Sequence, residues 1–190
     1  MYLFFDTETA DKPRNWKAPA ADLANWPRLV QLAWISCDDS GAPSATREYL
    51  IRPDGFTIKK GAAAVHGITT AIAQKDGVEL GPVLTEFAAA IETAQVVVAH
   101  NIAFDQPVVT AEFIRASMDT ALDRKTCRCT MKESTDYCKL PGPYGNKWPT
   151  LTELHQVMFG EAFGETHSAL ADAEACLRCF FQLQKVGVIL

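Results

Sequence analysis

The chain opens with the stretch Tyr2-Leu3-Phe4-Phe5-Asp6-Thr7-Glu8-Thr9, in which an apolar run leads directly into two carboxylates. The apolar residues predict a buried strand over residues 2–6. Because strand side chains alternate, Asp6 and Glu8 project from one face at the end of that strand. Like charges held this close repel each other unless a divalent cation lies between them, and oxygen-only ligation suits Mg²⁺ or Mn²⁺. An isolated Asp-x-Glu is a weak signal, however, and the alternative is a solvated strand end that carries acids by chance.

A second apolar run ends in polar residues at positions 96–105, which read Val-Val-Val-Ala-His-Asn-Ile-Ala-Phe-Asp. Residues 96–99 predict a buried strand, and His100 with Asn101 predicts the turn at its carboxyl end. Asp105 then falls in the first turn of the following helix and faces back toward the top of the sheet. The alternative is purely structural, because an acid near a helix N-terminus is favoured by the helix dipole alone.

A third group of polar residues is His167-Ser168-Ala169-Leu170-Ala171-Asp172. His167 and Asp172 are about 1.4 turns apart at 3.6 residues per turn, so they do not stack on one helix face. They converge if His167 precedes the helix and Asp172 lies inside it. A lone histidine in such a place is more often structural than catalytic. The pairing of His167 with Asp172, a third and separate acid site, favours a catalytic role for this histidine.

Taken together, Asp6, Glu8, Asp105 and Asp172 with His167 resemble the motifs of the DEDDh family of 3′–5′ exonucleases, the DnaQ-like group. The three motifs occur in the family's order over nearly the whole chain. Two further segments are similar to family segments: Pro27-Arg28-Leu29-Val30-Gln31-Leu32-Ala33 and Ala64-Val65-His66-Gly67-Ile68-Thr69. The chain departs from the family at Ala10-Asp11-Lys12-Pro13, where many members continue with Thr-Gly. That departure bears on substrate preference and leaves the carboxylates untouched.

The resemblance implies an α/β protein with the ribonuclease-H-like exonuclease fold, in which a central mixed β-sheet is flanked by helices. It also implies two Mg²⁺ or Mn²⁺ ions per active site, held by Asp6, Glu8, Asp105 and Asp172. In this hypothesis Asp6 bridges both ions, and Glu8 and Asp172 complete the site of the ion that binds the attacking water. Asp105 holds the second ion through water. His167 removes the proton of the attacking water, which suits an imidazole with an ordinary pKa of about 6.5.

The substrate implied by the resemblance is the 3′ end of DNA, single-stranded or frayed, with release of nucleoside 5′-monophosphates. Candidate contacts to the terminal nucleotide are Thr7, Thr9, Val65, His66, Asn101 and Phe104. For His66, a contact to substrate and a hydrogen bond that fixes the loop remain equal alternatives. An exoribonuclease acting on RNA 3′ ends or short oligonucleotides is one rival function, because contacts to a 2′-hydroxyl cannot be located in the sequence. A non-catalytic nucleic-acid-binding or polymerase-docking module is another, although the complete set of acids argues against it.

Length and composition agree with a single exonuclease domain over residues 1–190. No segment approaches the length of a membrane span, and the apolar start is too short for a secretory signal, so we expect a cytoplasmic protein. Six cysteines are compatible with a reduced interior. The residues Cys127, Cys129, Cys138, Cys176 and Cys179 raise the alternative of a zinc site, but their spacing is unusual for one and the last two suit the core of a final amphipathic helix.

The net charge of −5 is low for a protein that binds nucleic acid, and the four candidate active-site acids account for much of it. Residues 123–147 carry six basic and three acidic side chains, a local surplus of three positive charges. Such a stretch can follow a phosphate backbone, or it can simply be a solvated surface. The weak overall basicity argues against tight binding of duplexes. Whether a polymerase or a second copy of the chain is a partner stays open.

The order of elements supports the same α/β architecture, an antiparallel meander followed by alternating helices and strands. Strands are predicted at residues 2–6, 29–37, 46–51, 96–99 and 123–127. Helices are predicted at residues 61–66, 69–74, 82–93, 104–116, 129–138, 150–158 and 167–185. Thr150 with Glu153 predicts a capping box at the start of one of these helices.

Overall fold

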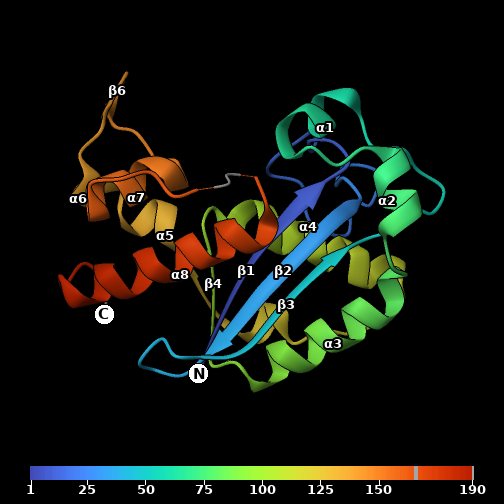
Figure 1. The fold of residues 1–190 in the computed structure, drawn as a ribbon, viewed down its shortest axis with the longest axis horizontal. Coiled ribbons are helices and arrows are strands. Elements are labelled where there is room, and N and C mark those ends of the chain that lie inside the picture. Colours follow the sequence, from blue (N-terminus) through green and yellow to red (C-terminus); the bar gives the residue numbers. More distant parts are fainter. Residues whose placement is uncertain (165–166, 190) are drawn as a thin grey trace.

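The computed structural model describes residues 1–164 and 167–189, and its centre is a five-stranded sheet in the order β3-β2-β1-β4-β5 (Figure 1). The strand pairs β1–β2 and β2–β3 are antiparallel, whereas β1–β4 and β4–β5 are parallel. The sheet is therefore mixed, and the predicted α/β class is confirmed. The strands are β1 Tyr2–Thr9, β2 Leu29–Cys37, β3 Pro43–Leu50, β4 Val96–Ala99 and β5 Thr126–Cys129.

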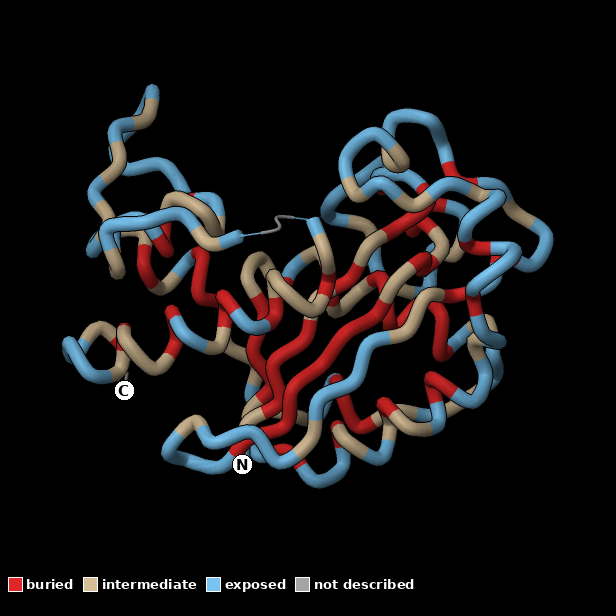
Figure 2. Tube along the Cα trace, in the orientation of Figure 1, coloured by how far each residue is buried: buried red, intermediate tan, exposed pale blue. Residues whose placement is uncertain are grey.

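Helices cover both faces of the sheet (Figure 1). They are α1 Lys60–His66, α2 Thr70–Asp76, α3 Leu80–Thr93, α4 Ile102–Arg115, α5 Thr130–Glu133, α6 Thr135–Cys138, α7 Leu151–Phe159 and α8 Ala169–Lys185. Because β1 alternates, Leu3 and Phe5 face the core formed with α3 and α4, while Phe4 faces the core formed with α7 and α8. Figure 2 shows the buried residues gathered in the strands and on the inward sides of the helices.

The first strand is longer than the apolar run predicts, and the prediction that it ends at residue 6 is wrong. Pairing with β2 continues through Thr7 opposite Leu32 and Glu8 opposite Gln31, followed by an irregularity before Thr9. Its parallel pairing with β4 stops at Phe4 opposite Val98. The last residues of β1 therefore extend past the end of β4 and form an open sheet edge there.

Two other short predicted elements differ from the structure. The strand predicted at residues 123–127 lies at Thr126–Cys129, preceded by a 3-10 turn over Leu122–Arg124. The helix predicted at residues 129–138 is two single turns, α5 and α6, joined at Ser134. A small hairpin of β6 Pro141–Gly142 and β7 Gly145–Asn146 was not predicted. These segments are four residues or shorter, so tertiary contacts rather than local preference decide their form.

The remaining helix predictions agree within a few residues, and the capping box is present: Thr150 accepts from the Glu153 backbone and Glu153 accepts from the Thr150 backbone. Cys176 and Cys179 are buried free thiols of α8, as predicted for core residues. No cysteine in the described part of the chain belongs to a group that could hold a metal. Nor does any helix within residues 1–164 and 167–189 have both the length and the apolarity needed to cross a membrane.

Candidate active site

Asp6 and Glu8 lie on the face of β1 that carries Phe4, so they continue toward the N-terminal end of α8. Phe4 packs edge-on against Phe180 of α8, with ring centroids 5.3 Å apart. This packing holds the helix across the strand. The first turn of α8 therefore lies against the end of β1 where the two carboxylates project.

The third acid, Asp105, lies in the first turn of α4, as its spacing from the strand predicted. The chain enters this helix through Asn101, which adopts a left-handed conformation with φ 71° and ψ 47°. Asp105 is almost fully buried, with 3% of its surface exposed. Its Oδ1 accepts a hydrogen bond of 2.7 Å from the hydroxyl of Thr7. The Thr7 hydroxyl of β1 thereby fixes the Asp105 carboxylate of α4 at the sheet edge.

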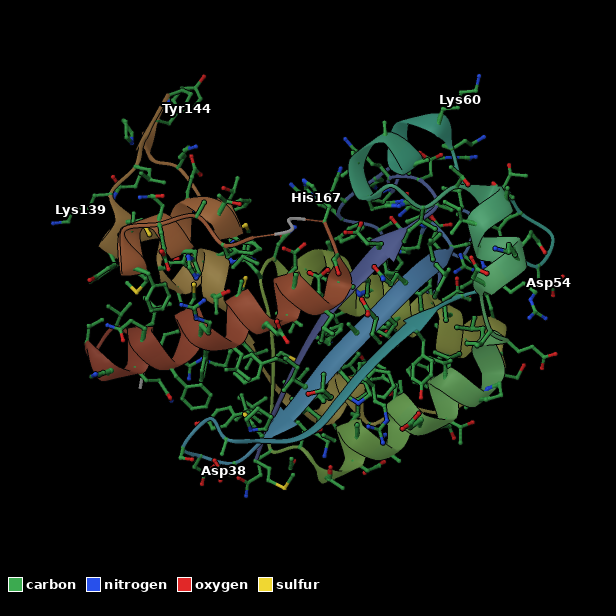
Figure 3. The ribbon with its side chains drawn as sticks, viewed as in Figure 1. Asp38, Asp54, Lys60, Lys139, Tyr144 and His167 are labelled. Carbon is green, nitrogen blue, oxygen red and sulfur yellow. The ribbon has the colours of Figure 1, made fainter. Side chains whose placement is uncertain are left out.

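The fourth acid and the histidine come from the start of α8. His167 precedes the helix in a left-handed conformation with φ 67°, and its backbone N–H donates to Asp172 Oδ2 at 3.2 Å. Asp172 lies in the first turn of α8. Potential metal-binding atoms of Glu8, His167 and Asp172 all lie within 4.8 Å of one another. Figure 3 shows His167 beside the end of β1, between the α5–α7 group and α1.

The protonation of the cluster reflects its burial and its crowding. Burial, and then repulsion by Asp105, Asp172 and Glu8, raises the pKa of Asp6 well above its usual value. Burial, with repulsion from Asp172 and Asp105, raises the pKa of Glu8 to about 8. Burial raises the pKa of Asp105 to about 7 and also raises the pKa of Asp172. Four carboxylates that resist ionisation together form a site that bound cations would stabilise in its charged form.

All five residues predicted to be catalytic line one cavity of about 510 Å³, and Thr7, Asn101 and Phe104 line it with them. A second cavity of about 570 Å³ adjoins it, because the two share Glu8 and Phe104. The other predicted contact residues, Thr9, Val65 and His66, line the second cavity. The structure thus brings together every site residue that the sequence singled out, in two adjoining cavities.

His66 makes the loop-fixing hydrogen bonds, which were one of the two alternatives that the sequence left open. Its Nδ1 accepts from the backbone N–H of Ile68 at 3.1 Å, so Nε2 carries the proton and donates to the carbonyl of Thr9 at 3.3 Å. These bonds join the loop after α1 to the end of β1. The ring also lines the second cavity, and burial lowers its pKa, which favours the neutral form.

Sequence reasoning missed Trp16, which lines the second cavity. Its indole is 56% exposed, and its ring centroid lies 5.5 Å from that of Phe104. The signal available in the sequence was the departure from the family pattern after Thr9, in a loop rich in proline and tryptophan. That loop also lies next to the first predicted site motif.

The loop that carries Trp16, residues 10–28, is pinned although it contains no helix or strand. Buried Asn25 accepts from the backbone N–H of Asn15 at 2.7 Å and donates to the Asn15 carbonyl at 3.0 Å. Arg115 of α4 donates to the carbonyls of Leu23 and Trp26 at 2.7 and 2.8 Å. The exposed indole therefore projects from a fixed backbone.

His100 is a second residue that the sequence did not single out for the site. It lines the acid cavity, and its two ring nitrogens lie 3.0 Å from the Thr130 hydroxyl and 3.1 Å from the Pro149 carbonyl. Because a carbonyl only accepts, Nε2 is the protonated nitrogen and Nδ1 accepts from Thr130. Burial lowers the pKa of His100 to about 4, so the ring stays neutral and joins β4 to the segment before α7.

The fold and the acid cluster are those expected for the exonuclease class of proteins. The family model RNase_T, described as Exonuclease, matches residues 3–180, and the chain belongs to this family. Its sheet and helices form the ribonuclease-H-like exonuclease fold. Proteins of this family depend on divalent metal ions. No curated protein sequence matches the chain.

Among solved structures, the chain is similar to E. coli exonuclease I in complex with a dA16 oligonucleotide, at 20% identity and a TM-score of 0.78, covering 97% of this chain and 40% of that one. The zinc-bound form of the E. coli exonuclease I complex with single-stranded DNA is 19% identical, with a TM-score of 0.79 and coverages of 98% and 41%. A product-bound exonuclease I is 17% identical, with a TM-score of 0.76 and coverages of 97% and 43%. The chain thus shares their fold but spans about two fifths of their length.

Proposed function

We propose that residues 1–190 act as one metal-dependent 3′–5′ exonuclease domain, which removes nucleoside 5′-monophosphates from single-stranded or frayed DNA 3′ ends. The observation that carries the proposal is the convergence of Asp6, Glu8, Asp105 and Asp172 on one cavity that adjoins a second. The second cavity has the size of a small-molecule site. An acid cluster joined to a nucleotide-sized cavity suits hydrolysis at a strand end.

Residues of three elements would hold the metal. Asp6 lies among the other acids and suits the bridging role between two Mg²⁺ or Mn²⁺ ions. Glu8 and Asp172 would complete one site and Asp105 the other. Two such ions supply a polarised attacking water and a charge opposite the leaving oxygen. The donor set fits this assignment, because carboxylate oxygens suit hard cations and the raised pKa values of the acids reflect repulsion that a cation would relieve.

His167 is assigned as the general base. It is exposed at the mouth of the cavity, while its backbone bond to Asp172 fixes the position of the residue. In the proposed step His167 takes a proton from water, and the water oxygen bonds to phosphorus. The bond from phosphorus to the 3′ oxygen of the penultimate nucleotide breaks, and that oxygen takes up a proton from solvent. The products are a nucleoside 5′-monophosphate and a strand one nucleotide shorter.

The terminal nucleotide is assigned to the second cavity. Phe104 and Trp16 provide aromatic surface for a base, and Val65 adds an apolar contact. His66 and Thr9 offer polar groups near Glu8 for the sugar. Lys12 and Lys59, which also line this cavity, offset part of the negative charge of the acids.

The six free thiols fit a reducing compartment, and we place the activity in the cytoplasm.

The test is digestion of three substrates by the purified chain with Mg²⁺ or Mn²⁺: a linear DNA oligonucleotide, the same sequence closed into a circle, and the matched RNA. A 3′-labelled linear strand should release labelled mononucleotide at once, a 5′-labelled strand should give a descending ladder, and excess chelator should stop both. Cutting of the circle would indicate an endonuclease. Faster digestion of RNA than of DNA would instead support the exoribonuclease alternative.

A further inference from the structure

Trp148 is a large aromatic side chain that the proposed function leaves without a role. It lines the acid cavity, yet 61% of its surface is exposed. Trp148 lies in the segment between β7 and α7, whereas the second cavity is lined by α1 and the loop of Trp16. In Figure 1 the α5–α7 group stands to the left of the β1 end, and α1 stands above it. Aromatic surface therefore flanks the acid cluster on two sides.

The backbone around Trp148 is held on both sides. Before it, the Lys147 N–H donates to the Leu140 carbonyl at 2.9 Å, and the Lys147 ammonium pairs with Glu153 at 2.5 Å. After it, the Pro149 carbonyl accepts from His100 at 3.1 Å, and Thr150 begins the capping box of α7. The indole is thus exposed from a fixed backbone, as the indole of Trp16 is. Apolar surface held in solvent in this way suits contact with a ligand.

A positive charge accompanies the indole. The Lys132 ammonium lies 5.9 Å from the ring centroid of Trp148, on its face. Within the described residues, no ion pair uses this ammonium. A ring face beside a cation is the combination that single-stranded nucleic acid binds, because bases stack on the ring and phosphates approach the charge. Trp148 therefore offers a ring on which a base can stack, and Lys132 offers a positive charge for a phosphate.

We propose that Trp148 with Lys132 forms a second base-stacking subsite, which receives the penultimate nucleotide of the bound strand. The inference rests on the proposed function. With the terminal nucleotide in the cavity of Phe104 and Trp16, the scissile phosphate lies over the acids, and the next nucleotide emerges on the side of Trp148. Stacking accepts any base, so the subsite adds affinity without sequence preference. It also grips the strand that remains after each cleavage.

The experiment compares Trp148→Ala, Trp148→Phe and wild type on two oligonucleotides, one normal and one with an abasic penultimate nucleotide. On the normal strand Trp148→Ala should lower kcat/KM roughly 5- to 100-fold, the range for one lost stack, and Trp148→Phe should keep most of it. On the abasic strand wild type should lose a similar factor, and Trp148→Ala should cause little further loss. Inhibition by a nucleoside 5′-monophosphate, which fills the terminal cavity alone, should be unchanged in Trp148→Ala.

A matched control is Tyr144→Ala, which should leave these values unaltered. Tyr144 is fully exposed at the tip of the β6–β7 hairpin, points away from the body of the protein, and does not line the acid cavity (Figure 3). Lys132→Gln should reduce the slope of log affinity against log salt by about 0.7, the value for one phosphate contact on a single strand.

Three results would overturn the subsite. Trp148→Ala could show no loss of kcat/KM on the normal strand, or an equal loss on the normal and the abasic strand. The third result is a loss that disappears when the third nucleotide from the end, and not the penultimate one, is abasic. The proposed function fails separately, if wild type degrades neither strand with Mg²⁺ or Mn²⁺. In that case the same pair of strands in a fluorescence-anisotropy titration still tests the subsite, because binding does not require hydrolysis.

Discussion

The hydroxyl of Thr7 donates a 2.7 Å hydrogen bond to the buried carboxylate of Asp105, joining residues 98 positions apart in the chain. Thr7 belongs to β1 and Asp105 to the first turn of α4, so this bond fixes the helix start against the strand that carries Asp6 and Glu8. The bond also lowers the pKa of Asp105 against the larger upward effect of burial. Thr7 therefore supports the site through the position and the charge of Asp105.

Removing that hydroxyl should weaken metal binding. We expect Thr7→Val, which keeps the side-chain shape, to reduce Mn²⁺ affinity and turnover about 10- to 100-fold, as is typical for groups that orient a metal ligand. Thr7→Ser keeps the donor and should stay near wild type. Calorimetric titration of Mn²⁺ together with kcat measures both effects. Wild-type Mn²⁺ affinity in Thr7→Val would show that the bond does not orient Asp105 for metal.

The metal-free protein should lose stability as pH rises. The pKa of Glu8 is about 8 in the fold against its usual 4.5, and that of Asp105 is about 7 against 3.8. Below their usual pKa values these carboxyls are protonated in both the folded and the unfolded protein, and the stability of the folded state is not reduced by their burial. As pH rises toward 8, the unfolded chain has released protons that the fold still holds, and the stabilisation is lost. In chelator, Tm should fall between about pH 5 and pH 8, and the gain on adding Mn²⁺ should be larger at pH 8.

Replacing one active-site carboxyl by a neutral side chain of the same shape tests whether the acid cluster causes this loss of stability at high pH. Asp6→Asn should abolish hydrolysis and yet raise the metal-free Tm at pH 8, because the amide is neutral and removes the cost of burying an ionisable carboxyl among other acids. Asp38→Asn is the control: Asp38 is exposed, and hydrogen bonds from Ser40 lower its pKa, so this change should give no gain. An Asp6→Asn protein less stable than wild type at pH 8 would contradict the repulsion argument.

His167→Ala should distinguish a base from a ligand. Loss of a general base lowers the rate about 10²- to 10⁴-fold, and Mn²⁺ affinity should be nearly unchanged. Asp172→Asn serves as the comparison and should weaken Mn²⁺ binding itself. Since His167 can reach a common point with Glu8 and Asp172, a large drop in Mn²⁺ affinity in His167→Ala would make it a ligand.

Trp16→Ala should raise KM for single-stranded DNA roughly 5- to 100-fold and leave kcat close to wild type, because it removes stacking surface away from the reacting atoms. Inhibition by a nucleoside 5′-monophosphate should weaken by a similar factor, and Trp16→Phe should restore most of it. The fold should be little affected, since the loop is held by Asn25 and Arg115 and not by the exposed indole. An unchanged inhibition constant would mean that the terminal base does not contact Trp16.

Local sequence was sufficient for the elements whose signals lie within a few neighbouring residues. The apolar run at Val96–Ala99 is a strand with the predicted bounds, and Asp105 lies in the helical turn that its spacing requires. The capping box of Thr150 and Glu153 is likewise a contact between near neighbours. Alternation on a strand and the turn of a helix are properties of the backbone itself, so they can be read from residue order.

Only the tertiary structure decided where distant side chains meet. Pairing of Glu8 with Gln31 extends β1 beyond its apolar run, and Arg115 fixes a loop 92 residues earlier through the carbonyl of Leu23. Neither Trp16 nor Trp148 has a local pattern that predicts a place beside the acids. Both line the cavities because hydrogen bonds fix their segments to residues far away in the chain, Arg115 and His100. The sequence by itself determined the acids, their order, and the strand and helix starts that carry them. The positions of the residues that line the cavities around the acids depend on packing and hydrogen bonding between residues far apart in the chain. Local backbone preference does not encode such contacts.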